Sequence, residues 1–276
     1  PTYKHIVHYP RYLGHEASGV VEAVGPGFHE VKIGDRIVPR RAHYATHHIV
    51  PVEQVLTHIP REIPLKEASL TLMTQETCFI VDHVGIQPGD KVLIVGLGPL
   101  GLLILEALRF KRCTELAVAD LVDHRLQVAN ELGAKYTVNS GTHDLVNAIY
   151  SIWPDGPNVV VDTTGRVGPM AQAIEVVAPN GKVVLAGRPY ETPAGLQIED
   201  LFDKMLTVYG AKTPPAGYTP AYASKALKRI AAGQVHAQRL ITHEFPLRRI
   251  GDAFELATHP ERGGLKIVVN CQESEG

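Results

Sequence analysis

Residues 91–101, Lys-Val-Leu-Ile-Val-Gly-Leu-Gly-Pro-Leu-Gly, are the stretch that decides the fold of this chain. The Val-Leu-Ile-Val run within it is wholly apolar, which is typical of a central parallel strand buried on both faces. Gly96, Gly98 and Gly101 follow in G-x-G-x-x-G spacing, and residues 102–110 are predicted to form a helix. The three glycines permit a sharp turn, leave room for a pyrophosphate and allow close packing of helix on strand. The phosphates are expected at the helix N-terminus, where N–H groups and the helix dipole favour anions.

A second apolar strand, over residues 116–119, ends in Asp120, where a carboxylate can bind a ribose 2′-hydroxyl. Strand, glycine triplet, helix, strand and terminal acid together predict a dinucleotide-binding unit. An ordinary βαβ unit with a glycine-rich turn is the alternative. Because a carboxylate repels the extra phosphate of NADP, Asp120 favours NAD(H). Arg125 could answer a phosphate, but it is expected to be an exposed residue in the first turns of the next helix.

Length and composition indicate an ordinary globular protein of about two domains, since the chain has 276 residues, 45% of them hydrophobic and 20% charged. A net charge of −2 gives no reason to expect nucleic acid or an anionic membrane as partner. No signal peptide is visible in the given sequence and no apolar run approaches roughly 18 residues, so a cytoplasmic protein is expected. Cys78, Cys113 and Cys271 are far apart, which argues against disulfides or a cysteine-built zinc site and predicts core thiols.

The chain is organised in two patterns. Strands and turns are predicted before residue 60, a helix in one or two pieces over residues 65–84, and alternating strands and helices after the glycine loop. This alternation predicts a doubly wound parallel sheet. The expected strands outside residues 91–101 cover residues 19–24, 36–38, 47–52, 116–119, 136–138, 158–162, 182–186, 206–209 and 265–269. The last strand of the parallel sheet, at residues 206–209, is expected at an edge.

Further short segments accompany the glycine loop. They are Gly14-His15-Glu16, Gly34-Asp35-Arg36-Ile37-Val38, Pro88-Gly89-Asp90, Asp162-Thr163-Thr164-Gly165, Gly181-Lys182-Val183-Val184, Leu240-Ile241-Thr242-His243 and Gly264-Leu265-Lys266-Ile267-Val268. In this order they resemble the medium-chain dehydrogenase/reductase family, and within it the zinc-type alcohol and polyol dehydrogenases such as the sorbitol dehydrogenases. The resemblance extends over nearly the whole chain.

The resemblance implies an α/β fold in which a Rossmann domain, residues 75–215, is inserted into a partial GroES-like β-barrel catalytic domain, residues 1–74 and 216–276. It also implies further cofactor contacts around the nicotinamide and the pyrophosphate. Together with the residues derived above, the expected cofactor-binding set is Gly96, Gly98, Pro99, Leu100, Gly101, Asp120, Arg125, Thr164, Gly165, Ala186, Gly187 and Lys266.

The metal pattern of the zinc-type members is only partly present. Such members hold a catalytic zinc through an upstream Cys, the His of Gly-His-Glu and a Cys or Glu in the linker helix. Here His15 and Glu16 are present, residues 70–73 of the linker contain no thiol or carboxylate, and Glu76 is the nearby substitute. The chain begins at Pro1, downstream of the expected Cys. Zinc is therefore expected in a longer protein with that Cys, and not at full occupancy in this chain. A hydrogen-bonded histidine at a domain junction is the alternative for His15.

The cysteine-rich lobe that binds a structural zinc in some members is also missing, because residues 39–43 pass directly to the strand expected at residues 47–52. His43, His47, His48 and His58 crowd this region, but their spacing matches no ligand pattern.

The resemblance implies an NAD(H)-dependent oxidoreductase that interconverts a secondary alcohol or polyol and its ketone, with His15 and Glu16 at the catalytic position. One alternative is a zinc-free enzyme similar to quinone reductases. The other is an NAD(H)-binding homologue without turnover. The expected partners are a small alcohol or ketone and further copies of the chain, in a homodimer or homotetramer.

Overall fold

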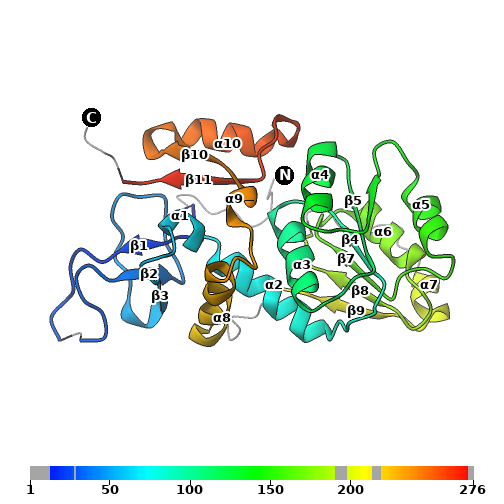
Figure 1. The fold of residues 1–276 in the computed structure, drawn as a ribbon, viewed down its shortest axis with the longest axis horizontal. Helices are drawn as coiled ribbons and strands as arrows, with labels where there is room; N and C mark the ends of the chain where they lie inside the picture. The colour runs from blue at the N-terminus through cyan, green and yellow to red at the C-terminus, as the bar shows by residue number, and fades with distance from the viewer. Residues whose placement is uncertain (1–12, 28, 190–197, 213–218, 273–276) are drawn as a thin grey trace. The chain divides into compact units, whose positions relative to one another are not determined.

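The computed structural model describes residues 13–27, 29–189, 198–212 and 219–272 (Figure 1). The described residues group into two compact units. The first unit lies within Ile80–Lys212, and the second comprises the described residues up to Phe79 and those from residue 219 onward. Within the described ranges, no helix has the length and apolar character needed to cross a membrane.

The first unit contains a parallel sheet, which in the described residues has six strands in the order β6-β5-β4-β7-β8-β9 (Figure 1). The strand order reverses between β4 and β7, and ligands of such sheets bind beyond the carboxyl ends of the strands at this point. The predicted doubly wound sheet, with its last strand at an edge, is confirmed. The strands are β4 (Val92–Val95), β5 (Leu116–Asp120), β6 (Tyr136–Asn139), β7 (Val159–Asp162), β8 (Lys182–Leu185) and β9 (Thr207–Gly210).

Helices connect these strands and cover the sheet. Every residue of β4, β5 and β7 is buried, as the continuous apolar runs predict. The helix after the glycine loop begins at Pro99, three residues before the predicted start, because proline suits the first helical position, where no N–H is needed. The helices of this unit are α3 (Pro99–Phe110), α4 (Asp123–Glu131), α5 (Leu145–Ile152), α6 (Val167–Val176) and α7 (Ile198–Asp203).

The second unit is built from residues that precede the parallel sheet in the sequence and residues that follow it. Strands β1 (Gly19–Val20), β2 (Arg36–Pro39) and β3 (Val55–His58) form an antiparallel sheet, and β10 (Ile241–Pro246) pairs in parallel with β11 (Lys266–Asn270). The helix predicted over residues 65–84 occurs in two pieces. The helices are α1 (Leu65–Ala68), α2 (Thr71–Val84, whose last residues belong to the first unit), α8 (Pro220–Ala231), α9 (Ala237–Leu240) and α10 (Ile250–Thr258).

Two predictions near the N-terminus are wrong in detail. Residues 47–51 form no strand; a 3-10 turn at Val52–Gln54 follows them, and the strand comes only at β3. Pro51 lacks the N–H that a strand needs, and the side chain of Ile49 is exposed, so this segment has nothing to pack against. The strand predicted at residues 19–24 is reduced to β1, and β10 was not predicted.

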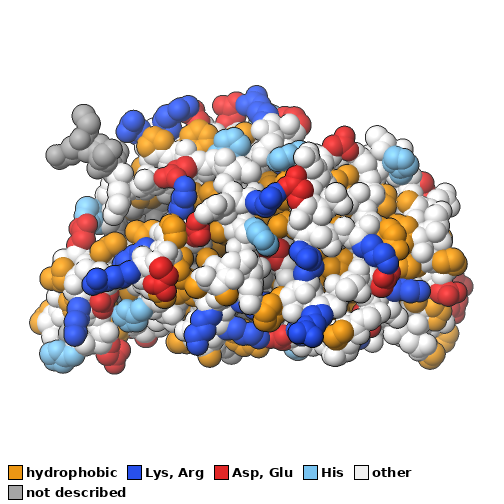
Figure 2. Space-filling view, in the orientation of Figure 1, with side chains coloured by type: hydrophobic (Ala, Val, Ile, Leu, Met, Phe, Trp, Pro, Cys, Tyr) orange, Lys and Arg blue, Asp and Glu red, His pale blue; other side chains and the backbone are white. Residues whose placement is uncertain are grey.

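Charged side chains of both signs are interspersed on the face shown in Figure 2, in keeping with the net charge of −2.

Candidate active site

The glycine loop between β4 and α3 has the geometry of a phosphate cradle. Gly96 has φ +91°, a conformation that favours glycine. A Cβ on Gly101 would lie 2.0 Å from the carbonyl oxygen of Gly96, so only glycine permits this packing of helix on strand. Gly98 caps α3 without any side-chain hydrogen bond, and a Cβ there would meet nothing within 4 Å. The loop therefore leaves open space in front of the first N–H groups of α3, beside Pro99 and Leu100.

Asp120 is held at the carboxyl end of β5, next to this loop. Its side chain is buried, its Oδ2 accepts a hydrogen bond from the N–H of Leu97 at 2.6 Å, and its Oδ1 accepts one from the N–H of Val122 at 3.0 Å. Each carboxylate oxygen can accept a further hydrogen bond. The same side chain therefore stabilises the glycine loop and offers acceptors for ribose hydroxyls.

Arg125 is less exposed than the sequence predicted. It was expected to be an exposed residue of the next helix, but its side chain is only 20% exposed and its Nη1 is 3.7 Å from Asp120 Oδ2. Its Nε is buried without a hydrogen-bond partner among the described residues. The first turn of α4 directs this side chain back over the end of β5, because helical side chains point toward the helix N-terminus. A positive charge thus stands beside the Asp120 carboxylate.

The turns after β7 and β8 bring together the four residues expected around the nicotinamide. The N–H groups of Ala186 and Gly187 both donate to the carbonyl oxygen of Asp162, at 2.8 and 2.9 Å. Gly165 has φ +65°, and a Cβ there would lie 2.0 Å from the carbonyl oxygen of Arg188. A Cβ on Gly96 would lie 2.9 Å from the Thr164 methyl group. These turns therefore lie directly against the glycine loop.

In the second unit, Glu16 and Lys266 form an ion pair in which both side chains are mostly buried. His15 lies beside the pair, with its Nε2 3.9 Å from the other oxygen of Glu16, and its side chain is 78% exposed. Lys266, expected near the pyrophosphate, thus has its ammonium group on Glu16 within this unit. The Gly-His-Glu segment and β11 are joined by this contact.

The donor set of the described residues does not fit a catalytic zinc. Such a site takes three protein ligands and keeps one open position. His15, Glu16 and Glu76 do not form such a group, and no cluster of three or more His, Cys, Asp or Glu in the described ranges is arranged to hold a metal. Glu16 is engaged with Lys266, and no described cysteine belongs to a group with His15 that could hold a metal.

The crowded histidines form separate pairs. The rings of His43 and His48 meet edge to face with centroids 4.8 Å apart, and burial together with His43 lowers the pKa of His48. His47 pairs with Glu22 at 2.8 Å, and His58 lies 3.8 Å from a carboxylate oxygen of Asp35. These residues share no common centre.

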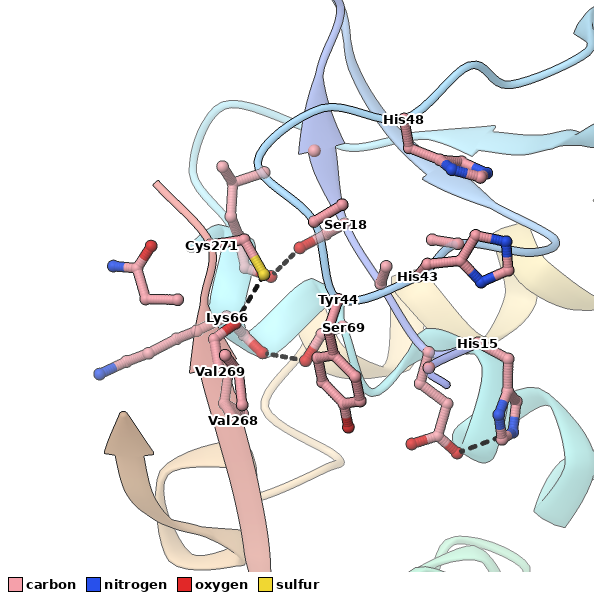
Figure 3. Close-up of a pocket in the computed structure, with 18 of the residues that line it drawn as sticks. His15, Ser18, His43, Tyr44, His48, Lys66, Ser69, Val268, Val269 and Cys271 are labelled. Carbon is pink, nitrogen blue, oxygen red and sulfur yellow. Dashed lines mark hydrogen bonds and ion pairs between the residues drawn. The ribbon is translucent and has the colours of Figure 1, made fainter. Parts of the chain in front are cut away.

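A cavity of about 690 Å³ opens in the second unit between the Gly-His-Glu segment, the loop before β3, α1 and β11 (Figure 3). Its volume suits a small molecule. The hydroxyl groups of Ser18 and Ser69 donate to backbone carbonyls at 2.6 Å, whereas the side chains of Tyr44 and Cys271 line the cavity wall. Burial, with smaller contributions from Glu16 and Cys271, raises the pKa of the Tyr44 hydroxyl. Tyr44 is therefore a neutral hydrogen-bond donor at neutral pH.

Tyr44 and Cys271 are cavity residues that sequence reasoning missed. Cys271 was expected in a core, but it is half-buried and lines the cavity, and burial raises the pKa of its thiol. Cys78 and Cys113 are buried as predicted. The sequence offers no signal for Cys271, because its place on the cavity wall depends on how β11 packs in the tertiary structure. For Tyr44 the one signal is its place among four histidines.

Two family models match the chain. One, described as zinc-binding dehydrogenase, matches residues 99–231, and one described as alcohol dehydrogenase GroES-like domain matches residues 2–55. The chain is 25% identical to sorbitol dehydrogenase from Bacillus subtilis, with 96% of this chain and 82% of that protein aligned. It is 28% identical to (R,R)-butanediol dehydrogenase from the same organism, over 94% of this chain and 81% of that protein.

Solved structures show the same fold. An alcohol dehydrogenase from E. coli CFT073, complexed with NADH, has a TM-score of 0.82 at 22% identity and covers 96% of this chain and 85% of its own. A zinc-binding dehydrogenase from Sinorhizobium meliloti 1021, bound to NADP, has a TM-score of 0.82 at 23% identity, with coverage of 94% and 83%.

Proposed function

Because this chain belongs to the zinc-type medium-chain dehydrogenase/reductase family, we propose that it is an NAD(H)-dependent oxidoreductase that interconverts a secondary alcohol or polyol with its ketone. Its relatives include dehydrogenases named for sorbitol and for butanediol, which supports the substrate class. The observation that supports the cofactor best is the glycine loop with Asp120 hydrogen-bonded to it.

The first unit supplies the cofactor site. When bound, the nicotinamide supplies the hydride chemistry. Asp120 would accept hydrogen bonds from the adenosine ribose, and the N–H groups at the start of α3 would bind the pyrophosphate. Thr164 and Gly165, with Ala186 and Gly187, would orient the nicotinamide ring. The open space at Gly98 and the close packing at Gly101 both suit a dinucleotide.

The second unit supplies polar groups for the substrate. His15 is accessible to solvent, and its Nε2 lies 3.9 Å from a carboxylate oxygen of Glu16. We propose that His15 donates a hydrogen bond to the substrate oxygen and exchanges its proton with water. Tyr44 is a second neutral donor on the cavity wall, where its raised pKa keeps the hydroxyl protonated.

Asp120 supports NAD(H) over NADP(H), because its carboxylate would repel a 2′-phosphate. Arg125 acts in the opposite direction, since its guanidinium stands within 3.7 Å of that carboxylate. We propose that Asp120 determines the preference for NAD(H), because it is the more buried of the two side chains and is hydrogen-bonded to the loop that would hold the pyrophosphate.

One observation favours a second candidate function. The described residues do not provide a zinc ligand set, and a zinc-free reductase resembling the quinone reductases would need none. The two functions differ in their response to metal. An alcohol dehydrogenase that depends on zinc loses turnover with a chelator, whereas a zinc-free enzyme reduces quinones with NADH in its presence.

The test is an NADH-linked assay over secondary alcohols, polyols, their ketones and quinones, with and without added zinc. Gly101→Ala provides a variant that should lose NADH binding and turnover, because its Cβ would lie 2.0 Å from the Gly96 oxygen. Gly168→Ala is the matched control, since a Cβ there meets nothing within 4 Å. Saturable NADH binding without turnover of any substrate would reject the enzyme and support a cofactor-binding homologue.

A further inference from the structure

The turn after β7 is tied to the glycine loop through the side chain of Thr163. The Thr163 hydroxyl oxygen lies 2.7 Å from the carbonyl oxygen of Gly96 and 3.2 Å from that of Val95. A hydroxyl has one hydrogen to donate, and the shorter contact makes Gly96 the main acceptor. The Thr163 N–H donates to Val95 as well, at 2.9 Å. Thr163 thus contacts the loop with both backbone and side chain.

The glycine loop is held from its other side by Asp120. Asp120 on β5 accepts the N–H of Leu97, while Thr163 after β7 donates to the carbonyl of Gly96, so both polar groups of one peptide unit are bound by neighbouring strand ends. A Cβ on Gly96 would lie 2.6 Å, and one on Gly101 3.3 Å, from the Thr163 hydroxyl oxygen. The hydroxyl therefore occupies the space that these two glycines leave free.

Asp162 fixes the turn in which Thr163 lies. Its side chain is fully buried, and its Oδ1 accepts hydrogen bonds from the Thr164 N–H at 2.9 Å and the Thr164 hydroxyl at 2.6 Å. Its backbone carbonyl receives the N–H groups of Ala186 and Gly187. The turn is therefore held by hydrogen bonds on the side where the nicotinamide would bind, and Thr163 is its link to the side where the pyrophosphate would bind.

We propose that Thr163 is a positioning residue for the dinucleotide, whose hydroxyl sets the spacing between the pyrophosphate loop and the nicotinamide turn. This role rests on the proposed function, because it requires a cofactor that spans both segments. A ligand that spans them depends on the link. A ligand limited to the adenosine half, which meets Asp120, does not.

The experiment measures the dissociation constants of NADH and of AMP by calorimetry for the whole chain and its variants. Thr163→Val keeps the shape and removes the hydroxyl, and NADH should bind about fivefold to tenfold more weakly, as for the loss of one partly buried hydrogen bond. AMP should bind within about twofold of the unmodified protein. Thr163→Ser restores the hydroxyl and should restore NADH affinity. Thr142→Val, at an exposed threonine of the same unit, is the matched control.

Thermal unfolding of each variant accompanies the titrations, and Thr163→Ala replaces the valine variant if that variant does not fold. Unchanged NADH affinity without the hydroxyl would overturn the positioning role. So would an equal loss of NADH and AMP affinity, because that outcome indicates a general loss of structure. Failure of the unmodified chain to bind NADH would overturn the proposed function and this role with it, which distinguishes the two.

Discussion

Glu16 and Lys266 stand 250 positions apart in the chain and form an ion pair in which their side chains are 17% and 16% exposed. The pair joins the Gly-His-Glu segment to β11. It also places an ammonium group on Glu16, the carboxylate that the family resemblance predicted to lie near a metal. An ammonium group at that position competes with a metal ion for the same oxygen. The pair therefore bears directly on whether the described residues can retain zinc.

The 276-residue chain, purified without added metal, should contain well under one zinc per chain. Lys266 holds Glu16, and the described residues place no group of three ligands around His15, so His15 would hold zinc only weakly. Elemental analysis by mass spectrometry measures the content, and His15→Ala should not change it. Stoichiometric zinc that is lost on His15→Ala would show that ligands outside the described residues complete a site.

Cofactor choice should depend on Asp120 and Arg125 together. NADH should bind at least about tenfold more tightly than NADPH, a difference of about 1.4 kcal/mol. Asp120→Ala should narrow this difference, because it removes the repelling carboxylate and releases the guanidinium 3.7 Å away. Asp120→Ala should therefore bind NADPH more tightly than the unmodified chain does. The double variant Asp120→Ala/Arg125→Ala should not show this gain in NADPH affinity. Fluorescence titration with both cofactors measures each case, and equal affinities in the unmodified protein would contradict the assignment.

The chain should assemble through β9, the edge strand of the parallel sheet. An exposed strand edge is prone to pairing, and a second copy across a two-fold axis would cover it. Phe202 and Met205, 83% and 68% exposed, precede this edge, and Val208 within it is also exposed. Light scattering at micromolar concentration should show a dimer or a tetramer, and Val208→Lys should shift it toward monomer. Ile33→Lys, at an apolar residue of the second unit, is the control.

Asp162 should make the stability of the first unit depend on pH. Burial, only partly offset by hydrogen bonds from Thr164 and Gly165, raises its pKa above the ordinary value of 3.8. The folded chain then holds this proton at pH values where the unfolded chain has lost it. The contribution of Asp162 to stability is thus present below about pH 3.8 and is lost as the pH rises through the folded-state pKa.

The variant Asp162→Asn is uncharged at every pH and keeps an acceptor for Thr164. Its free energy of unfolding, measured with denaturant, should therefore improve relative to the unmodified chain between pH 4 and pH 7. A difference between the two proteins that stays constant over this range would show that Asp162 titrates normally in the folded state.

Much of the first unit could be predicted from local sequence alone. Val92–Val95 is apolar throughout, the glycines follow at fixed spacing, and Asp120 ends the next strand, so the strand, the loop and the carboxylate at the end of β5 are all encoded within one short segment. Buried parallel strands need continuous apolar runs, and a tight phosphate loop needs glycine. Because these requirements are strict, they produce a pattern that can be recognised in the amino-acid sequence.

The second unit could be predicted less well, because its strands are short and half-exposed. The residues around Ile49 have β-forming character, but Pro51 and the lack of a packing partner exclude a strand there. Strand β10 was not predicted from the sequence. Where one face is exposed and strands are brief, local preference is weak and tertiary packing decides.

By itself, the sequence determined the parallel strands of the first unit, the glycine loop and the carboxylate at the end of β5. Only the tertiary structure decided which distant groups meet: Glu16 with Lys266, Arg125 with Asp120, Thr163 with Gly96, and Cys271 with the cavity near Tyr44. The first set consists of residues close in sequence, whose geometry follows from backbone periodicity. The second set consists of side-chain contacts, most of them made across strands and helices far apart in the chain, and these depend on how the elements pack.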